Sequence, residues 1–434
     1  MTNNLQKGPS VAPDLGQMSP IWLNTTLLLE ITELLTQHKS SSTPQKRSGF
    51  AYEIFVLYQT CIEQSQLAAK EVGNRINTVC IEKKVAFQSF QKENFANAKK
   101  RRYFPDQPSL SRFISELNQS AMIETFWNDV LFAHLLLLKQ KGIVSTKIKL
   151  IADYTEEPCK KNPEDKYCFG KKEGHTVHKT LTFSILSNDL HQIIANYKIA
   201  KQAHKLPFFE KIVDRLRSNG FNIIYTLLDR GFYRKEILKA FKSWKITLIM
   251  PGRKCKQTLG KLLKYLLGKG TRRAKGFIPL KYVKKQGFPK VTFDLLIVAK
   301  KSYTLNEIRE EVNQNKITLV QALKRIFPLI VGLWGDQGIS TLKGNEKYIR
   351  NLYRQRWAIE IAFREMNRLG ISNHMQNRDG RLSIMGAKCL IYNIWQVQRD
   401  LIQKENPISA PLELNEFLGK TQIHRYIHYI PTSI

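Results

Sequence analysis

The stretch NIIYTLLD, residues 222–229, constrains the fold more strongly than any other part of this sequence. It is apolar along nearly its whole length and ends in an aspartate, a pattern typical of a strand that is buried on both faces. Such strands belong to parallel sheets, because the helices that connect parallel strands cover both sides of the sheet. We therefore expect an α/β core that contains this strand.

The segments around this strand continue the α/β pattern. Helices are predicted at 208–220, where an amphipathic stretch stops at Gly220, and at 233–244. Apolar patterning predicts further strands at 146–153, 179–186, 192–200 and 246–250. The predicted order of elements is therefore β-β-β-α-β-α-β.

The balance of charge indicates a polyanionic partner. The 434 residues include 69 Lys and Arg against 36 Asp and Glu, a formal net charge of +33. An excess of this size repels itself unless an anion neutralises it, and nucleic acid is the usual candidate. A basic protein without such a partner is the alternative. Residues 252–301 hold fifteen Lys and Arg against the single acid Asp294, which favours a contact with the DNA backbone over a solvated surface.

Cysteine usage and the apolar segments indicate a cytoplasmic protein. There are six cysteines and no CxxC pair, which suggests reduced thiols. The first residues, MTNNLQKGPSVAPDL, contain no apolar segment of a secretory signal. The longest apolar run, residues 130–138, is too short to span a bilayer, so we expect no membrane partner.

A helix with a narrow polar strip is predicted over YRQRWAIEIAFREMN, residues 353–367. At about 100° per residue, roughly one third of its circumference carries Tyr353, Arg356, Glu360, Arg364 and Asn367. Apolar residues occupy the neighbouring arc, which predicts a buried face. A solvated face would normally use pairs of Lys and Glu. One acid among arginines, a tyrosine and an amide instead indicates the lining of an anionic site.

Two carboxylates, Asp153 and Asp229, each end a predicted strand. Sites in α/β sheets form at the carboxyl ends of strands, so these aspartates lie side by side if their strands are neighbours. Glu360 would complete a set of oxygen ligands suited to Mg²⁺. Two such ions about 4 Å apart can activate a nucleophile and stabilise a leaving oxygen in phosphoryl transfer. The structural alternative is that each aspartate only caps a strand or forms a turn.

The segments IADYT, LLDRGFY and YRQRWAIEIAFREMN resemble the DDE transposases of bacterial and archaeal insertion sequences. The group concerned has its last acid in a Tyr-x2-Arg-x3-Glu-x6-Lys signature, which Tyr353, Arg356 and Glu360 match in type and spacing. The lysine position of the signature falls on Asn367, so Arg368 or Arg364 would have to supply that charge. The resemblance covers about residues 145–405.

This resemblance implies a ribonuclease H-like mixed sheet flanked by helices. It implies that Asp153, Asp229 and Glu360 bind two Mg²⁺ ions, for which Mn²⁺ can substitute. The implied reaction is hydrolysis of a phosphodiester at the ends of an insertion sequence, followed by transfer of the freed 3′-hydroxyl into target DNA. The implied partners are the terminal inverted repeats and target DNA. We also expect a homodimer in the synaptic complex and a location in the nucleoid.

Phosphate contacts near the cleaved strand are expected from Tyr353 and Arg356. Further DNA contacts are expected from polar or basic residues in four places: the same helix, the position after Asp229, a basic run near residue 100 and the basic segment near residue 272. These residues are Arg364, Asn367, Arg368, Arg230, Lys100, Arg101, Arg272 and Arg273.

The chain is expected to divide into five parts. A helical DNA-binding region is predicted at 1–140 and the first part of the catalytic core at 141–251. A basic, β-containing insertion follows at 252–344, with strands around VTFDLLIVAK (291–300) and FPLIVGLWGD (327–336). The second part of the core, 345–405, holds the glutamate helix and another long helix at 382–402, and 406–434 forms a tail.

Three other readings of the sequence stay open. A recombinase could use Tyr353 as a covalent nucleophile without a metal, and a decayed transposase could retain DNA binding alone. The third reading concerns Cys159, Cys168, His175 and His178, which lie between the first two predicted strands. These residues could be zinc ligands, or they could belong to a basic loop. Their spacing, C-x8-C-x6-H-x2-H, is not a usual one for a zinc finger.

Overall fold

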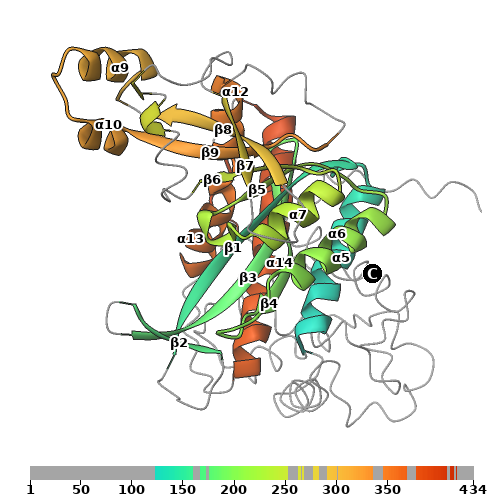
Figure 1. The fold of residues 1–434 in the computed structure, drawn as a ribbon. Coiled ribbons are helices and arrows are strands. Elements are labelled where there is room, and N and C mark those ends of the chain that lie inside the picture. The colour runs from blue at the N-terminus through green and yellow to red at the C-terminus, as the bar shows by residue number, and fades with distance from the viewer. Residues whose placement is uncertain are drawn as a thin grey trace, which may run out of the picture. The chain divides into compact units, whose positions relative to one another are not determined.

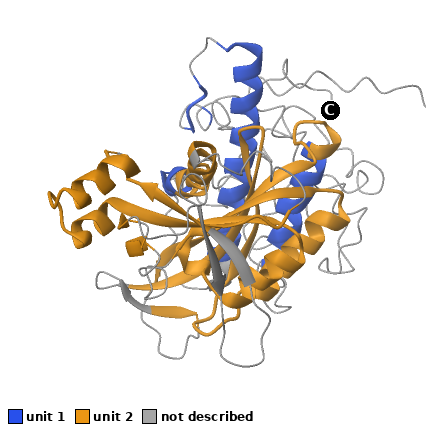
Figure 2. Ribbon diagram, turned by 45° about the horizontal axis from the view of Figure 1, so that its top comes forward, with its two compact units in different colours: residues 1–138, 364–434 blue, residues 139–363 orange. Residues whose placement is uncertain are grey.

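The computed structural model describes residues 123–159, 167–172, 175–252, 262–264, 266–267, 277–282, 291–300, 302–335, 346–368, 378–407, 411–414 and 417. The chain divides into two compact units (Figure 2). One consists of residues 139–363, and the other combines residues 1–138 with 364–434. The division into the five predicted parts stays a prediction.

The unit of residues 139–363 is built on a mixed sheet whose strands and helices are labelled in Figure 1. The first part of the unit contains β1 (Lys147–Cys159), β2 (Cys168–Lys172), β3 (His175–Ser187), β4 (Leu190–Lys198), α6 (Leu206–Ser218), β5 (Asn222–Leu228), α7 (Lys235–Ser243) and β6 (Thr247–Pro251). Strands β1, β5 and β6 are parallel neighbours, and β3 and β4 follow antiparallel on the other side of β1.

The predicted order of elements is confirmed except for one additional strand, β2, between the first two predicted strands. Strands β1, β3 and β4, helix α6, strand β5, helix α7 and strand β6 reproduce the pattern β-β-β-α-β-α-β. The apolar segment that predicted a strand buried on both faces is β5, with β1 on one side and β6 on the other. The mixed sheet with its helices confirms the expected α/β fold class.

Strand β1 differs from its prediction because it does not end at Asp153. It continues to Cys159, and this second half pairs with β3 from Cys159↔Thr176 to Asp153↔Thr182. The residues expected to form a loop therefore extend β1, form β2 and begin β3. Asp153 marks the point where β1 loses its other neighbour, since pairing with β5 stops at Ala152↔Leu228.

The basic segment after β6 adds further strands to the same sheet. Strands β7 (Phe277–Tyr282), β8 (Val291–Ala299) and β9 (Ile326–Gly332) continue it in the order β6-β9-β8-β7. Helices α9 (Leu305–Asn313) and α10 (Leu319–Arg325) lie between β8 and β9 in the chain, and each begins with a capping box. The two strands predicted in this region are β8 and β9.

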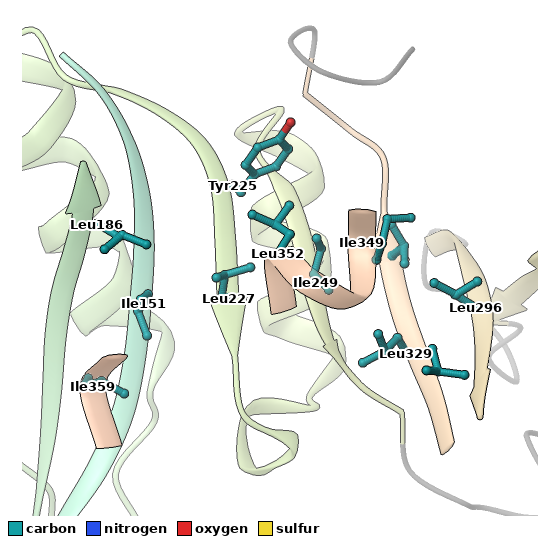
Figure 3. Close-up of a cluster of buried hydrophobic side chains, with 12 residues drawn as sticks. Ile151, Leu186, Tyr225, Leu227, Ile249, Leu296, Leu329, Ile349, Leu352 and Ile359 are labelled. Atoms are coloured by element: carbon teal, nitrogen blue, oxygen red, sulfur yellow. The ribbon is translucent and has the colours of Figure 1, made fainter. Parts of the chain in front are cut away.

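The glutamate-bearing segment packs on the sheet through apolar side chains (Figure 3). Helix α12 (Glu346–Arg354) contributes Ile349 and Leu352 to a buried cluster, and helix α13 (Trp357–Arg368) contributes Ile359. Their partners include Ile151 of β1 and Leu227 of β5. Each of these side chains stabilises the packing by about 1.5–3 kcal/mol relative to an exposed position.

The single helix predicted over 353–367 is wrong, because the chain breaks between α12 and α13. At the break, the N–H of Arg356 donates to the carbonyl of Tyr353 at 3.1 Å, and the N–H of Ala358 donates to the carbonyl of Gln355 at 3.0 Å. These are the tighter bonds of a 3₁₀ turn. The sequence does not reveal the break, since residues 346–368 contain neither Gly nor Pro.

The second unit contains α5 (Ile123–Gln140) up to Leu138, and α14 (Arg378–Glu405). These helices approach closely, because a Cβ added at Gly386 would lie 2.2 Å from Cδ2 of Trp127. Helix α14 confirms the helix predicted at 382–402. Within the described residues, no helix has the length and apolar content needed to cross a membrane.

Candidate active site

Asp153 and Asp229 occupy equivalent positions on neighbouring parallel strands. The pairing of β1 with β5 ends at Ala152↔Leu228, and each aspartate is the next residue of its chain. Adjacent strands lie about 4.8 Å apart, so the two carboxylates project from the same edge of the parallel ladder. The predicted juxtaposition of these acids depended on β1 and β5 being neighbours, and they are.

Backbone N–H groups hold one oxygen of each aspartate. The N–H of Tyr154 donates to Oδ1 of Asp153 at 2.8 Å. Asp229 caps the short 3₁₀ helix η4 (Arg230–Phe232), and the N–H of Gly231 donates to its Oδ2 at 3.2 Å. These contacts fix the orientation of both carboxylates.

Arg356 links the third acid to the first. Its Nη1 donates to Oδ2 of Asp153 at 2.5 Å, and its Nη2 donates to Oε1 of Glu360. Its Nε donates to the hydroxyl of Tyr353 at 3.2 Å. Arg356 is only 7% exposed, whereas the side chain of Glu360 is 49% exposed. The break before α13 therefore places a buried cation between a partly buried acid and an accessible one.

The pKa of Asp153 reflects this crowded environment. It is raised from 3.8 to about 6, and burial is the largest cause. The Arg356 guanidinium and the Tyr154 N–H lower the pKa in part, while Asp229 and Glu360 contribute to the rise. The carboxylate of Asp153 is thus held among like charges, and a cation at this position stabilises its ionised form.

The donor set has the chemistry of a site for a hard divalent cation. Asp153, Asp229 and Glu360 supply carboxylate oxygens, which suit Mg²⁺ or Mn²⁺. Among the residues that the structure describes, however, no three carboxylate, thiol or imidazole side chains lie close enough together to hold one metal ion. Arg356, rather than a shared metal position, joins Asp153 to Glu360.

An aromatic pair that the sequence reasoning missed connects the two aspartate segments. The ring of Tyr154 stacks on the ring of Phe232, with centroids 4.8 Å apart and planes 9° apart. The ammonium of Lys205 lies 4.7 Å from the centroid of the Tyr154 ring. The sequence contained one signal of this pair, which is its position: one aromatic residue directly follows Asp153 and the other lies three residues after Asp229.

The remaining predicted DNA contacts are distributed over several regions. Arg230 is exposed directly after Asp229, and α13 exposes Arg364, Asn367 and Arg368, which belong to the unit that combines residues 1–138 with 364–434. Both arginines of α13 approach Glu365, at 3.5 Å and 3.1 Å. Lys100, Arg101, Arg272 and Arg273 lie outside the described residues, as does most of the region 1–140. The DNA contacts of this whole set stay predictions.

The cysteine and histidine cluster does not supply a zinc site among the described side chains. Cys159 and Cys168 approach each other, with 3.4 Å between their sulfurs. His178 lies opposite Cys168 in the pairing of β2 with β3. No group of three metal-ligating side chains forms there or elsewhere in the described residues, and the side chain of His175 lies outside them.

A comparison with solved structures matches this chain to two transposase complexes, both with TM-scores below 0.5. The piggyBac transposase synaptic complex with hairpin DNA is 11% identical, with 96% of this chain and 83% of that chain covered and a TM-score of 0.48. The Drosophila P element transposase strand transfer complex is 9% identical, with 94% and 86% covered and a TM-score of 0.24. No curated protein sequence matches the chain.

A sequence-family comparison is more informative than these structures. Residues 145–394 match the family described as the transposase DDE domain. The match spans more than half of the 434 residues and includes all three acids discussed above. The chain therefore belongs to the DDE transposase family and is a DNA transposase, an enzyme that cuts DNA and transfers the cut strand.

Proposed function

We propose that Asp153, Asp229 and Glu360 are the catalytic acids of this transposase and that they bind two Mg²⁺ ions. DDE transposases generally use divalent metals. The observation that carries the assignment is the end of the β1–β5 pairing, which puts two aspartates at the same edge of the sheet. The contacts of Arg356 with Asp153 and Glu360 support the third acid. Mn²⁺ is expected to replace Mg²⁺.

The proposed reaction is hydrolysis of a phosphodiester at the ends of an insertion sequence, followed by attack of the freed 3′-hydroxyl on target DNA. The bound ions would activate the attacking oxygen and stabilise the leaving oxygen. The backbone N–H groups of Tyr154 and Gly231 keep the carboxylates in place during both steps. Exposed Glu360 lies at the accessible side of the site, where a DNA strand can reach it.

Tyr353 and Arg356 are proposed to position a phosphate beside the acids. A guanidinium presents several N–H donors in one plane, which matches the oxygens of a phosphate. Burial raises the pKa of Tyr353 to about 12, although Arg356 lowers it in part. The phenol is therefore protonated at neutral pH, which suits a hydrogen-bonding role and does not favour the recombinase alternative.

DNA at the element ends and at the target is the proposed partner, in agreement with the net charge of +33. Recognition of two ends calls for more than one protomer, so we propose a homodimer on DNA. Binding of this kind would place the protein at the nucleoid. The exposed residues Arg230, Arg364, Asn367 and Arg368 are proposed as further contacts with the DNA backbone.

Cleavage of DNA that carries the flanking element ends, in the presence of Mg²⁺, tests the assignment. Asp153→Ala, Asp229→Ala and Glu360→Ala should each abolish cleavage while DNA binding is retained. Glu310→Ala is the matched control, because this exposed glutamate lies in α9 and is not one of the proposed acids. A fully active variant at any of the three acids removes that residue from the assignment. Binding without cleavage by the wild type would favour a decayed, DNA-binding transposase.

A further inference from the structure

Arg356 contacts the same carboxylates that the proposed metal ions need. Its guanidinium contacts Oδ2 of Asp153 and Oε1 of Glu360, and the other oxygen of Asp153 already accepts the Tyr154 N–H. A guanidinium keeps its positive charge at every relevant pH. A divalent cation and Arg356 therefore compete for one charged oxygen on each of two acids.

The position of Arg356 in the chain allows its guanidinium to move away from the two acids. Arg356 lies at the junction of α12 and α13, where the backbone forms a 3₁₀ turn. Leu352 and Ile359 anchor the two helices in the buried cluster on either side of the junction. The guanidinium can thus leave the acids by rotation of its own side chain while both helices stay packed on the sheet.

We propose that Arg356 couples DNA binding to metal binding. The proposal rests on the proposed function. A DNA phosphate offers the guanidinium a bidentate partner, so DNA binding draws Arg356 away from Asp153 and Glu360. The carboxylate oxygens are then available to the metal ions. Without DNA, Arg356 neutralises the acids and keeps metal affinity low, and the two proposed ions assemble with their acids only when a substrate strand is present.

If DNA and the metal ions affect each other's binding, the effect is reciprocal. It can therefore be measured as the difference in metal affinity between the protein alone and its complex with DNA. The readout is Mn²⁺ binding followed by electron paramagnetic resonance, with a duplex that ends at the element terminus. In the wild type, the duplex should raise Mn²⁺ affinity at least about tenfold. In Arg356→Gln, the affinity without DNA should already be raised at least about tenfold, and the further effect of DNA should shrink by a similar factor.

Two variants isolate the role of Arg356 from charge and folding effects. Arg354→Gln removes one exposed positive charge two residues away, and it should leave Mn²⁺ affinity without DNA within about twofold of the wild type. Arg356→Lys keeps the charge but loses the planar donors, and should keep metal affinity low without DNA. Circular dichroism of each variant establishes that it is folded.

The outcomes separate this proposal from the proposed function. If Asp153→Ala does not weaken Mn²⁺ binding to the DNA complex, Asp153 is not a metal ligand and the proposed function fails. If Asp153→Ala does weaken it but Arg356→Gln binds Mn²⁺ no better than the wild type without DNA, the acids stand and only the coupling role of Arg356 is overturned. An equal rise in Arg354→Gln would show a general charge effect and would also overturn it.

Discussion

The ring of Tyr154 lies flat on the ring of Phe232, so the segments that follow Asp153 and Asp229 contact each other through two aromatic side chains. Phe232 is fully buried. It also packs edge-to-face against Phe209 of α6, at 5.5 Å between centroids. The stack therefore connects the floor of the acid site to a helix beneath it, and its loss should disturb the spacing of the two aspartates.

We predict that Phe232→Leu lowers the free energy of unfolding by about 1–2 kcal/mol and reduces cleavage by a larger factor than DNA binding. The matched control is Phe241→Leu in α7, because Phe241 is equally buried and contacts the same Phe209. The control should lose similar stability in a urea titration with little loss of cleavage. Equal cleavage by the two variants would show that the stack does not position the acids.

Asp153 is predicted to make stability depend on pH between about 4 and about 6. Its pKa is raised above the usual 3.8 to about 6, chiefly by burial, so the folded chain holds this proton more tightly than the unfolded chain. Protonation therefore favours folding, and the contribution of Asp153 to the free energy of unfolding falls as pH rises through this window. The steepest change is about 1.4 kcal/mol per pH unit.

Asp153→Asn removes this titration, and urea titrations of both proteins at several pH values measure it. The stability of the wild type minus that of the variant should decline from about pH 4 to about pH 6 and then stay level. A difference that instead rises with pH below about pH 4 and is level from about pH 4 to about pH 6 would mean that Arg356 outweighs burial and holds the pKa of Asp153 below its usual value.

Tyr353→Phe is predicted to retain cleavage, reduced by no more than about 150-fold relative to the wild type. The change removes only the hydroxyl that accepts the Nε–H of Arg356, and a single hydrogen bond to a charged group contributes about 1.5–3 kcal/mol at most. Cleavage products separated under denaturing conditions should contain no protein–DNA adduct in either protein. Complete loss of cleavage together with an adduct in the wild type would instead identify Tyr353 as a nucleophile.

Gly386→Ala is predicted to destabilise the unit that contains α5 and α14. The added methyl would lie 2.2 Å from the Trp127 ring, so the helices must separate or the indole must move, at a cost of about 1–3 kcal/mol or more. In a Trp127→Leu background the same change should cost less, because the ring that it meets is absent. Additive losses in the double variant, measured by thermal unfolding, would contradict the contact.

The sequence was sufficient for most strands of the sheet and for the aspartate that follows β5, but not for β2, β7 or the pairing of the strands. Continuous apolar runs identified β5 and β6, and the aspartate after β5 followed from the end of its run. Strand β1 was harder, because only its pairing with β5 ends near Asp153, while its pairing with β3 continues to Cys159. Which neighbour a strand loses at a given residue depends on long-range pairing and is not encoded in its local pattern.

The helix that carries Glu360 shows a different limit. Ile349, Leu352 and Ile359 keep helical spacing across the break at Gln355 and Arg356, so the apolar pattern predicts one continuous helix. The polar strip predicted on one continuous helix therefore extends over two helices and a turn, although its Arg356 and Glu360 do contact each other. The contact of Arg356 with Asp153, which lies 203 residues earlier, could not be predicted from periodicity within one segment.

Strand β9 runs antiparallel along β6 from Leu248↔Gly332 to Pro251↔Leu329. The basic segment that contains β7, β8 and β9 is consequently not a detachable module. Its excision would leave β6 paired with β5 alone, and the unpaired side of β6 would be an exposed sheet edge that invites association with other chains. A shortened transposase of this type would need another segment to pair with or cover β6 before its catalytic residues could function.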